Sequence, residues 1–429
     1  MKVCVFGLWH LGCVTAACLA DAGHQVVGID PDSAAIEGLR AGKAPLFEPG
    51  LDALIAKGAA KGRLAFTTDL SAASDAEVAW ITFDTPVDED DQPRPQVVLD
   101  LICELCSHLP RGALVLISSQ LPAGSSRSLS RLQAGRGLTF GYSPENLRLG
   151  KAIEVFTRPD RVVVGLEAES DRAKVAALLA PITDRIVWMG LESAEMTKHA
   201  INAFLATSIA FMNEIATVCE QVGADAREVE LGLKSEARIG PSAYLSPGGA
   251  FAGGTLARDI ATLSDLGRAG GVETRLVRSV RDSNAAHRRW PFNKLKERFA
   301  NLAGKRIALL GLTYKPGTDT LRRSTAVELG QELAGEGAKV HAFDPAVRAL
   351  PGDIAGAITL HPSAEAALAG AVALVLATPW PEFRKLDWPS LLARMSDKVI
   401  VDAAGFLAAE LATSPGAAYV AVGRPWPRS

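Results

Sequence analysis

The sequence lacks any block of one charge sign. Its 45 Lys and Arg residues face 48 Asp and Glu residues, which gives a formal net charge of −3. Proteins that bind nucleic acid or an anionic membrane surface usually carry a basic patch. We therefore expect neither nucleic acid nor membrane among the partners, and we expect any anionic ligand to be held by local groups.

Long apolar runs and a cysteine framework are also missing. No run approaches the roughly 18 apolar residues of a membrane span, and the chain enters its first apolar segment without a charged leader. The six cysteines fall mostly inside apolar segments, which predicts buried thiols in a reducing compartment. Cys103 and Cys106 have CxxC spacing, but no second pair or His cluster completes a metal site. We expect a cytoplasmic protein without a metal.

Three apolar segments near the N-terminus recur in the same order near the C-terminus. The N-terminal set comprises residues 2–8, 24–31 and 79–86, and the similar C-terminal set comprises residues 305–312, 339–345 and 374–379. Further strands are expected at residues 113–118, 138–142, 161–164, 186–189, 398–402 and 418–422. Short, almost continuously apolar strands separated by helical segments are typical of parallel strands buried on both faces. The fold class is therefore α/β, with two Rossmann-like, doubly wound parallel-sheet domains in a chain of 429 residues.

A long central helix is predicted between the two sheets. Residues 193–222 contain no Pro and no Gly, carry apolar residues at helical spacing, and end at Gly223. A helix of about 30 residues spans roughly 45 Å, which is too long for one globular core to cover. Its free face is a candidate homodimer surface, and the alternative is a helix that is merely central.

The first predicted strand runs into a glycine loop. In Gly7-Leu8-Trp9-His10-Leu11-Gly12, Gly7 permits a tight turn and Gly12 lets the following helix pack on the strand. Asp30, at the end of the second strand, is placed to bind a ribose 2′-hydroxyl and favours NAD over NADP. Trp9 replaces the usual middle glycine, so its indole must point away from the pyrophosphate or displace it. The alternative is a βα turn that binds nothing.

Several other segments, taken in order, cover nearly the whole chain. They are Phe47-Glu48-Pro49-Gly50-Leu51, Ser143-Pro144-Glu145-Asn146-Leu147-Arg148, Arg158-Pro159-Asp160-Arg161, Lys198 with Asn202, Arg238-Ile239-Gly240, Phe251-Ala252-Gly253-Gly254-Thr255-Leu256-Ala257-Arg258-Asp259, and Gly311-Leu312-Thr313-Tyr314-Lys315-Pro316 with Asp319 and Arg322. Together with the glycine loop, they resemble the UDP-glucose/GDP-mannose dehydrogenase family.

That resemblance implies NAD-dependent oxidation of the C6 hydroxymethyl of a nucleotide diphosphate sugar, in two hydride steps that end in a uronic acid. The first step needs a base and a hydride acceptor. The second needs a nucleophile on the aldehyde, for which the family uses a cysteine thiolate. The implied catalytic residues are Lys198, Asn202, Asp259, Glu145 and Thr255. The implied cofactor residues are Gly7, Trp9, His10, Leu11, Gly12, Asp30, Thr85, Pro86 and Gln120. The implied substrate residues are Glu145, Leu147, Arg148, Lys198, Asn202, Arg238, Phe251, Gly253, Lys315 and Arg322. The resemblance implies that Arg238 reaches the substrate site of a neighbouring subunit.

The departures from the family pattern lie in the chemistry. Thr255 stands in place of the nucleophilic cysteine, and a threonine hydroxyl stays un-ionised at neutral pH. Leu149 replaces a second glutamate, Gln120 a threonine, and Arg258 a lysine. We therefore expect the reaction to halt at the aldehyde after one hydride transfer.

The resemblance divides the chain into three expected parts. Residues 1–190 form the NAD-binding domain, residues 191–300 a central helical region for dimerisation and the active site, and residues 301–429 the C-terminal nucleotide-sugar-binding domain. Two other functions stay open: a catalytically silent nucleotide-sugar-binding protein, favoured by Trp9 and Thr255, and a dehydrogenase of a different hydroxyl substrate. Lys315 and Arg322, two cations suited to a diphosphate, argue against the second.

Overall fold

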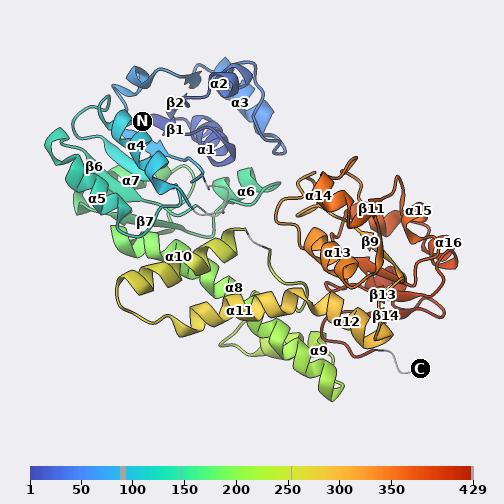
Figure 1. Cartoon of the computed structure of the whole chain (residues 1–429). Helices are drawn as coiled ribbons and strands as arrows, with labels where there is room; N and C mark the ends of the chain where they lie inside the picture. The colour runs from blue at the N-terminus through green and yellow to red at the C-terminus, as the bar shows by residue number, and fades with distance from the viewer. Residues whose placement is uncertain (87–92, 146, 253, 427–429) are drawn as a thin grey trace. The chain divides into compact units, whose positions relative to one another are not determined.

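The computed structural model describes residues 1–86, 93–145, 147–252 and 254–426 (Figure 1). Contacts between residues divide the chain into two compact units, Met1–Ala200 and Ile201–Ser429. Each unit contains one sheet, as the repeated segments predicted.

The first unit is built on an eight-stranded sheet of order β3-β2-β1-β4-β5-β6-β7-β8. Its strands are β1 (Lys2–Phe6), β2 (Gln25–Ile29), β3 (Leu64–Thr67), β4 (Val78–Ile81), β5 (Leu114–Ile117), β6 (Thr139–Tyr142), β7 (Val162–Leu166) and β8 (Ile186–Gly190). The prediction of parallel pairing is wrong at one place, because β6 and β7 are antiparallel. The chain between them turns back without crossing the sheet. The segment after β6 therefore starts and ends at the same edge of the sheet, and it contains the predicted substrate residues Glu145, Leu147 and Arg148.

Helices cover both faces of this sheet. They are α1 (His10–Asp21), α2 (Ser33–Arg40), α3 (Leu51–Ala60), α4 (Pro95–Cys106), α5 (Ser125–Leu132), α6 (Ala152–Thr157) and α7 (Arg172–Leu179), with short 3-10 turns η1 (Leu70–Ala73), η2 (Ala134–Arg136) and η3 (Glu169–Asp171). Helix α1 is buried from Leu11 to Ala20, and most of the residues in that stretch are small. Small side chains let the helix approach β1 closely, which fixes the position of its first turn.

Five of the six cysteines are buried thiols, as predicted for most of them, and Cys103 is partly exposed. All six are free. Burial raises the pKa of Cys4, Cys13, Cys18 and Cys106 to about 12, so these thiols stay protonated at neutral pH. Among the described residues, no group of three or more His, Cys, Asp or Glu is placed to hold a metal ion.

The predicted central helix is α8 (Leu191–Val222). By length and composition alone this helix is long and apolar enough to cross a membrane, which was not expected from the sequence. Of its most apolar 18-residue stretch, 44% is buried inside the protein. Ala203, Ala206 and Ala210 of α8 pack against Ile260 and Val280.

The second unit combines helices with a six-stranded, fully parallel sheet of order β11-β10-β9-β12-β13-β14. Its strands are β9 (Arg306–Leu310), β10 (Lys339–Phe343), β11 (Ile358–Leu360), β12 (Ala373–Leu376), β13 (Val399–Val401) and β14 (Ala418–Val420). Its helices are α9 (Ala226–Ser235), α10 (Thr255–Ala269), α11 (Arg275–Arg288), α12 (Trp290–Phe299), α13 (Thr325–Gly335), α14 (Gly352–Ala355), α15 (Ala364–Leu368), α16 (Trp388–Ala393) and α17 (Ala408–Leu411), with the 3-10 turn η4 (Pro381–Lys385).

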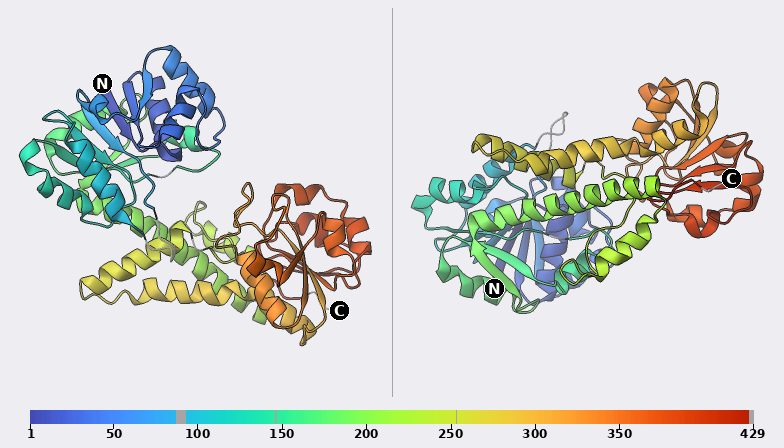
Figure 2. Two further views of the ribbon diagram at one scale, coloured as in Figure 1. Left: turned by 45° about the horizontal axis from the view of Figure 1, so that its top comes forward. Right: turned by 90° about the horizontal axis from the view of Figure 1, so that it is seen from below.

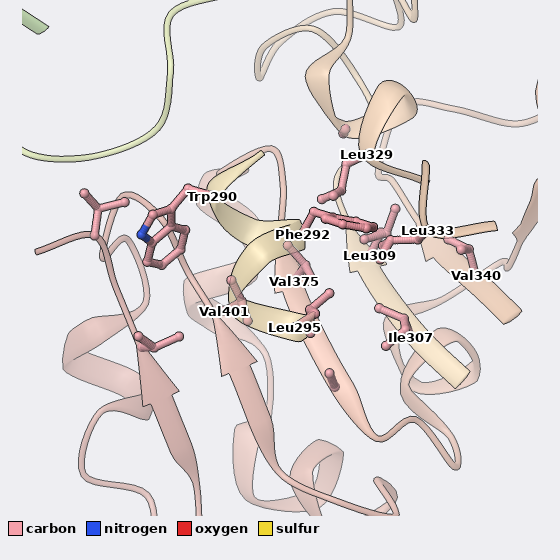
Figure 3. Close-up of a cluster of buried hydrophobic side chains, with 14 of the residues drawn as sticks. Trp290, Phe292, Leu295, Ile307, Leu309, Leu329, Leu333, Val340, Val375 and Val401 are labelled. Carbon is pink, nitrogen blue, oxygen red and sulfur yellow. The ribbon is translucent and has the colours of Figure 1, made fainter. Parts of the chain in front are cut away.

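Two packing arrangements hold the second unit together. Helices α10 and α11 form an antiparallel pair beside α8 (Figure 2). Phe292 and Leu295 of α12 pack onto the sheet beside Leu309 of β9 and Leu333 of α13 (Figure 3). Full burial of each such side chain contributes roughly 1.5–3 kcal/mol, so α12 is firmly tied to the sheet.

Candidate active site

The glycine loop after β1 has the geometry of a dinucleotide site. Gly7 has a φ of +102°, which other residues rarely adopt, and its carbonyl accepts a hydrogen bond of 2.7 Å from the Thr82 hydroxyl. A Cβ on Gly12 would lie 1.8 Å from the Gly7 oxygen, so only glycine allows α1 to start this close to β1. The first turn of α1 thus presents its backbone N–H groups beside the loop, an arrangement that suits a pyrophosphate.

Asp30 closes this loop from the end of β2. Its Oδ2 accepts a hydrogen bond of 2.6 Å from the Leu8 N–H, and its Oδ1 accepts one of 2.9 Å from the Asp32 N–H. The carboxylate is nearly buried and held in one orientation. The residues present therefore fit a dinucleotide: the glycines leave room for its phosphates, and Asp30 offers a fixed acceptor for a ribose hydroxyl.

Trp9 and His10 lie at the start of α1. Trp9 immediately precedes the helix and is 48% exposed, so its indole is not packed inside the protein. His10 is the first residue of the helix, and its Nε2 lies 2.9 Å from Glu48 Oε2. Leu11 follows inside the buried face of the helix.

The remaining predicted cofactor residues follow the next two strands. The Thr85 hydroxyl, after β4, donates a hydrogen bond of 2.6 Å to the Gln120 carbonyl, after β5. Pro86 is exposed and Gln120 is half-buried. These loops extend the line of strand ends at which open α/β sheets bind ligands.

Lys198 of α8 reaches the segment that follows β6. Its Nζ donates a hydrogen bond of 2.5 Å to the Glu145 carbonyl and lies 3.5 Å from Glu145 Oε2. The Lys198 side chain is 14% exposed and that of Glu145 is 30% exposed, so the pair is accessible to a small ligand. Of the neighbouring predicted substrate residues, Leu147 is half-buried and Arg148 is exposed.

Asn202, one turn further along α8, holds a buried carboxylate. Its Nδ2 donates a hydrogen bond of 2.5 Å to Asp259 Oδ2, and Asp259 is fully buried. Thr255 is the first residue of α10 and is exposed, four residues before Asp259 on the same helix. Residues four apart in a helix lie on one face. The structure thus places the substituted nucleophile position one turn from a buried carboxylate.

The loop before Thr255 is anchored by residues that the sequence analysis missed. Asn284 of α11 accepts a hydrogen bond from the Phe251 N–H and donates one to the Phe251 carbonyl, both 2.9 Å long. The Asn213 Oδ1 of α8 accepts a hydrogen bond of 3.0 Å from the Gly248 N–H. His287 Nε2 lies 2.8 Å from the Gly248 carbonyl. Burial lowers the pKa of His287, which favours a neutral ring that donates its N–H. Gly253, a predicted substrate residue, lies outside the described residues.

Glu195 of α8 is another residue that was not predicted from the sequence. It is fully buried, and its carboxylate accepts hydrogen bonds of 2.6 Å from the Gly124 N–H and 2.8 Å from the Ser126 N–H. A carboxylate at the start of α5 satisfies backbone donors that the helix itself leaves unpaired. Glu195 thereby fixes the chain that follows Gln120, one turn before Lys198.

Arg238, predicted to reach a neighbouring subunit, is exposed. Its guanidinium bonds only locally among the contacts described, with Nε donating to Glu236 Oε1 at 2.9 Å.

The loop after β9 has the same backbone arrangement as the glycine loop after β1. Gly311 has a φ of +87°, and Asp344 Oδ2 accepts a hydrogen bond of 2.7 Å from the Leu312 N–H. Asp344 also accepts a hydrogen bond of 3.1 Å from the Trp380 indole and is 1% exposed, against 9% for Asp30. The carboxylate of the second loop is therefore less available to a ligand than that of the first. Further along this loop, the predicted phosphate ligands Lys315 and Arg322 are both exposed.

Comparison with known proteins covers almost the whole chain. Models of the UDP-glucose/GDP-mannose dehydrogenase family match in order: the NAD-binding domain at residues 1–183, the central domain at 192–286 and the UDP-binding domain at 308–409. UDP-glucose 6-dehydrogenase from Pseudomonas aeruginosa is 34% identical, over 99% of this chain and 98% of its own. The enzyme of that name from Rhizobium meliloti is also 34% identical, over 99% and 100%.

Solved structures give the same picture. A UDP-glucose dehydrogenase from Pyrobaculum islandicum matches with a TM-score of 0.80 and 30% identity, over 94% of this chain and 93% of that one. A UDP-D-ManNAc dehydrogenase from Pyrococcus horikoshii matches with a TM-score of 0.83 and 27% identity, over 99% of both chains.

Proposed function

Because the chain belongs to the UDP-glucose/GDP-mannose dehydrogenase family, we propose that it oxidises the C6 hydroxymethyl of a nucleotide diphosphate sugar. The family assignment makes the chain an NAD-dependent oxidoreductase of nucleotide sugars. The position oxidised, the number of hydrides and the residue roles are the proposal. NAD supplies the hydride acceptor when bound.

The observation that carries the proposal is the buried carboxylate of Asp259, held by Asn202 one turn after Thr255. In the first step, Asp259 is the acceptor for the proton of the C6 hydroxyl, acting directly or through a water. The Lys198 ammonium and the Asn202 amide lie one helical turn apart and stabilise the negative charge that develops on the oxygen. One C–H bond is lost as a hydride, one O–H bond as a proton, and an aldehyde results.

The second oxidation requires a tetrahedral adduct on the aldehyde, and here the chain departs from its family. Thr255 offers a hydroxyl at the head of α10, and a hydroxyl is a far weaker nucleophile at neutral pH than a partly ionised thiol. Leu149, where the family often has a second glutamate, is 50% exposed and cannot activate water. We therefore propose that the aldehyde or its hydrate is the main product.

We further propose that the active unit is a homodimer. Phe204, Phe211 and Val218 of α8 recur every seven residues and are 71%, 47% and 58% exposed. A seven-residue spacing keeps them on one face of the helix, and a second copy would cover that apolar stripe. The exposed Arg238 is then available to a neighbouring substrate site. The three-part division at residues 190 and 300 and a cytoplasmic location belong to the same proposal.

The test is a panel of UDP-, GDP-, dTDP- and CDP-sugars, each mixed with NAD. Reduced cofactor is followed by absorbance, and the product is identified by mass. We expect NADH with one nucleotide sugar or a few related ones, and none with simple hydroxyacids. If no nucleotide sugar yields NADH although NAD binds, the proposed function is wrong. Asp259→Asn should abolish turnover and leave NADH binding unchanged, which separates catalysis from cofactor affinity.

A further inference from the structure

Glu48 is a buried carboxylate to which no role has so far been given. It lies in the loop before α3 and is 4% exposed. Its Oε2 lies 2.9 Å from His10 Nε2 and accepts a hydrogen bond of 2.8 Å from the Gly150 N–H. Its Oε1 accepts a hydrogen bond of 2.9 Å from the Ala152 N–H. One side chain therefore holds two segments that are about 140 residues apart in the sequence.

One segment lies at the proposed NAD site, and the other lies beside the predicted nucleotide-sugar residues. His10 is the first residue of α1 and lies inside the glycine loop, between Gly7 and Gly12. Gly150 and Ala152 follow directly on Leu147 and Arg148, the predicted substrate residues. We propose that Glu48 is a positioning residue that couples the binding of NAD to the binding of the nucleotide sugar. This inference rests on the proposed function.

The charge state of Glu48 suits such a bridge. Burial raises its pKa, but the bonds from His10, Gly150 and Ala152 outweigh that cost, so the net pKa lies below the ordinary value. An ionised carboxylate only accepts hydrogen bonds, and His10 must therefore carry its proton on Nε2. Ligand contacts that tilt the His10 ring act on the same carboxylate that orients residues 150–152.

The surroundings of Glu48 indicate a ligand-binding region rather than a sealed core. A cavity of about 380 Å³ lies against it and is also lined by Gly150, Lys151 and Arg158. A cavity that contains a carboxylate with a shifted pKa is a candidate binding site. The bridge thus borders space that a bound molecule can occupy.

Glu48→Gln weakens the bridge without changing its size. A glutamine offers one accepting oxygen and one NH2 group, which cannot accept. If the oxygen faces Ala152, the acceptor for both His10 and Gly150 is lost; if it faces His10 and Gly150, the Ala152 bond is lost. In either orientation at least one bond to residues 150–152 is lost, so the two segments are joined less tightly. His10→Ala releases the other end and serves as a second variant if Glu48→Gln does not fold.

A matched control is Asp52→Asn. Asp52 anchors the same loop, because its carboxylate accepts a hydrogen bond of 2.9 Å from the Ala44 N–H, and none of the contacts described joins it to His10 or residues 150–152. It therefore reports the effect of merely loosening this loop.

The experiment measures coupling with a pair of ligands that cannot react, NADH and UDP-glucose. The Kd of NADH is measured by fluorescence with and without saturating UDP-glucose. We expect UDP-glucose to change the Kd of the wild-type protein by about 5-fold or more, the lower end of typical coupling between sites. The ratio should fall to about 1 in His10→Ala and move from the wild-type value toward 1 in Glu48→Gln. It should stay at the wild-type value in Asp52→Asn, and fall no further in the double variant of Glu48 and His10 than in His10→Ala.

The outcomes separate the two claims. If both ligands bind and the ratio is 1 in the wild type, or is unchanged in Glu48→Gln, the coupling role of Glu48 is wrong and the proposed function stands. If NADH binds but neither UDP-glucose nor any other nucleotide sugar of the panel does, the proposed function is wrong and the coupling role falls with it. If NADH does not bind at all, the proposed function fails and the coupling role falls with it.

Discussion

The hydrogen bonds of Asn284 allow the sharpest prediction about the loop that precedes Thr255. Asn284 is 4% exposed and pairs with both the N–H and the carbonyl of Phe251 at 2.9 Å. Asn284→Ala leaves both backbone groups without a partner, at about 1–3 kcal/mol for each buried group. Because Phe251 is half-buried, water can bind to these backbone groups and offset part of the cost. We expect the ordered conformation of the loop to be destabilised by about 2–4 kcal/mol in total.

That free energy shifts the equilibrium between ordered and disordered loop by roughly 30- to 1000-fold, since each 1.4 kcal/mol is a factor of ten. Because Thr255 and Asp259 follow on this loop, kcat/KM for the nucleotide sugar should fall by up to that factor. The Kd of NADH should not change, because none of the contacts described joins Asn284 to the glycine loop. The assay is steady-state turnover beside NADH fluorescence.

Asn284→Asp is the matched variant. A carboxylate still accepts from the Phe251 N–H but cannot donate to its carbonyl, so the loss should be intermediate. If Asn284→Ala keeps the wild-type kcat/KM while circular dichroism shows an intact fold, Asn284 does not hold the loop before Thr255 in place.

Four further predictions follow from named side chains. Trp9→Gly should tighten NAD binding, measured by calorimetry, and unchanged or weaker binding would mean that the exposed indole stacks on the cofactor instead of obstructing it. Phe211→Asp should convert the dimer to a monomer in light scattering, because a charge in the apolar stripe opposes its burial; a wild-type monomer would already exclude the dimer. The lowered pKa of Glu48 stabilises the fold above its ordinary value of 4.5, and this contribution is lost as the pH falls through the native pKa, so the difference in free energy of unfolding between wild type and Glu48→Gln should shrink below pH 4.5. Thr255→Cys should gain uronic acid by mass spectrometry, whereas no gain would place the limit at thioester hydrolysis, where Leu149 stands.

Features encoded locally could be predicted from the sequence. The glycine loop, the terminal Asp30 and the long α8 depend on backbone conformation and periodicity within one short segment, and they are found where they were expected. The direction of β7 could not be predicted, because an apolar strand has the same pattern whichever way it runs.

The anchors were missed for a different reason. Asn284 and Glu195 are buried polar residues on amphipathic helices, and in the sequence they look like residues of a solvated face. Their roles arise only when a distant loop brings unpaired backbone groups to them. Such positions become recognisable once the partner loop is known to need donors or acceptors.

The most direct test of the account is the stoichiometry of a single turnover. The nucleotide sugar is mixed with NAD and an excess of enzyme. NADH is quantified by absorbance, and the product is identified by mass spectrometry. We predict about one NADH per sugar and an aldehyde or its hydrate, because we propose that Thr255 is too weak a nucleophile to form the adduct that a second hydride transfer requires. Two NADH per sugar and a uronic acid, formed at the rate of the first step, would contradict it.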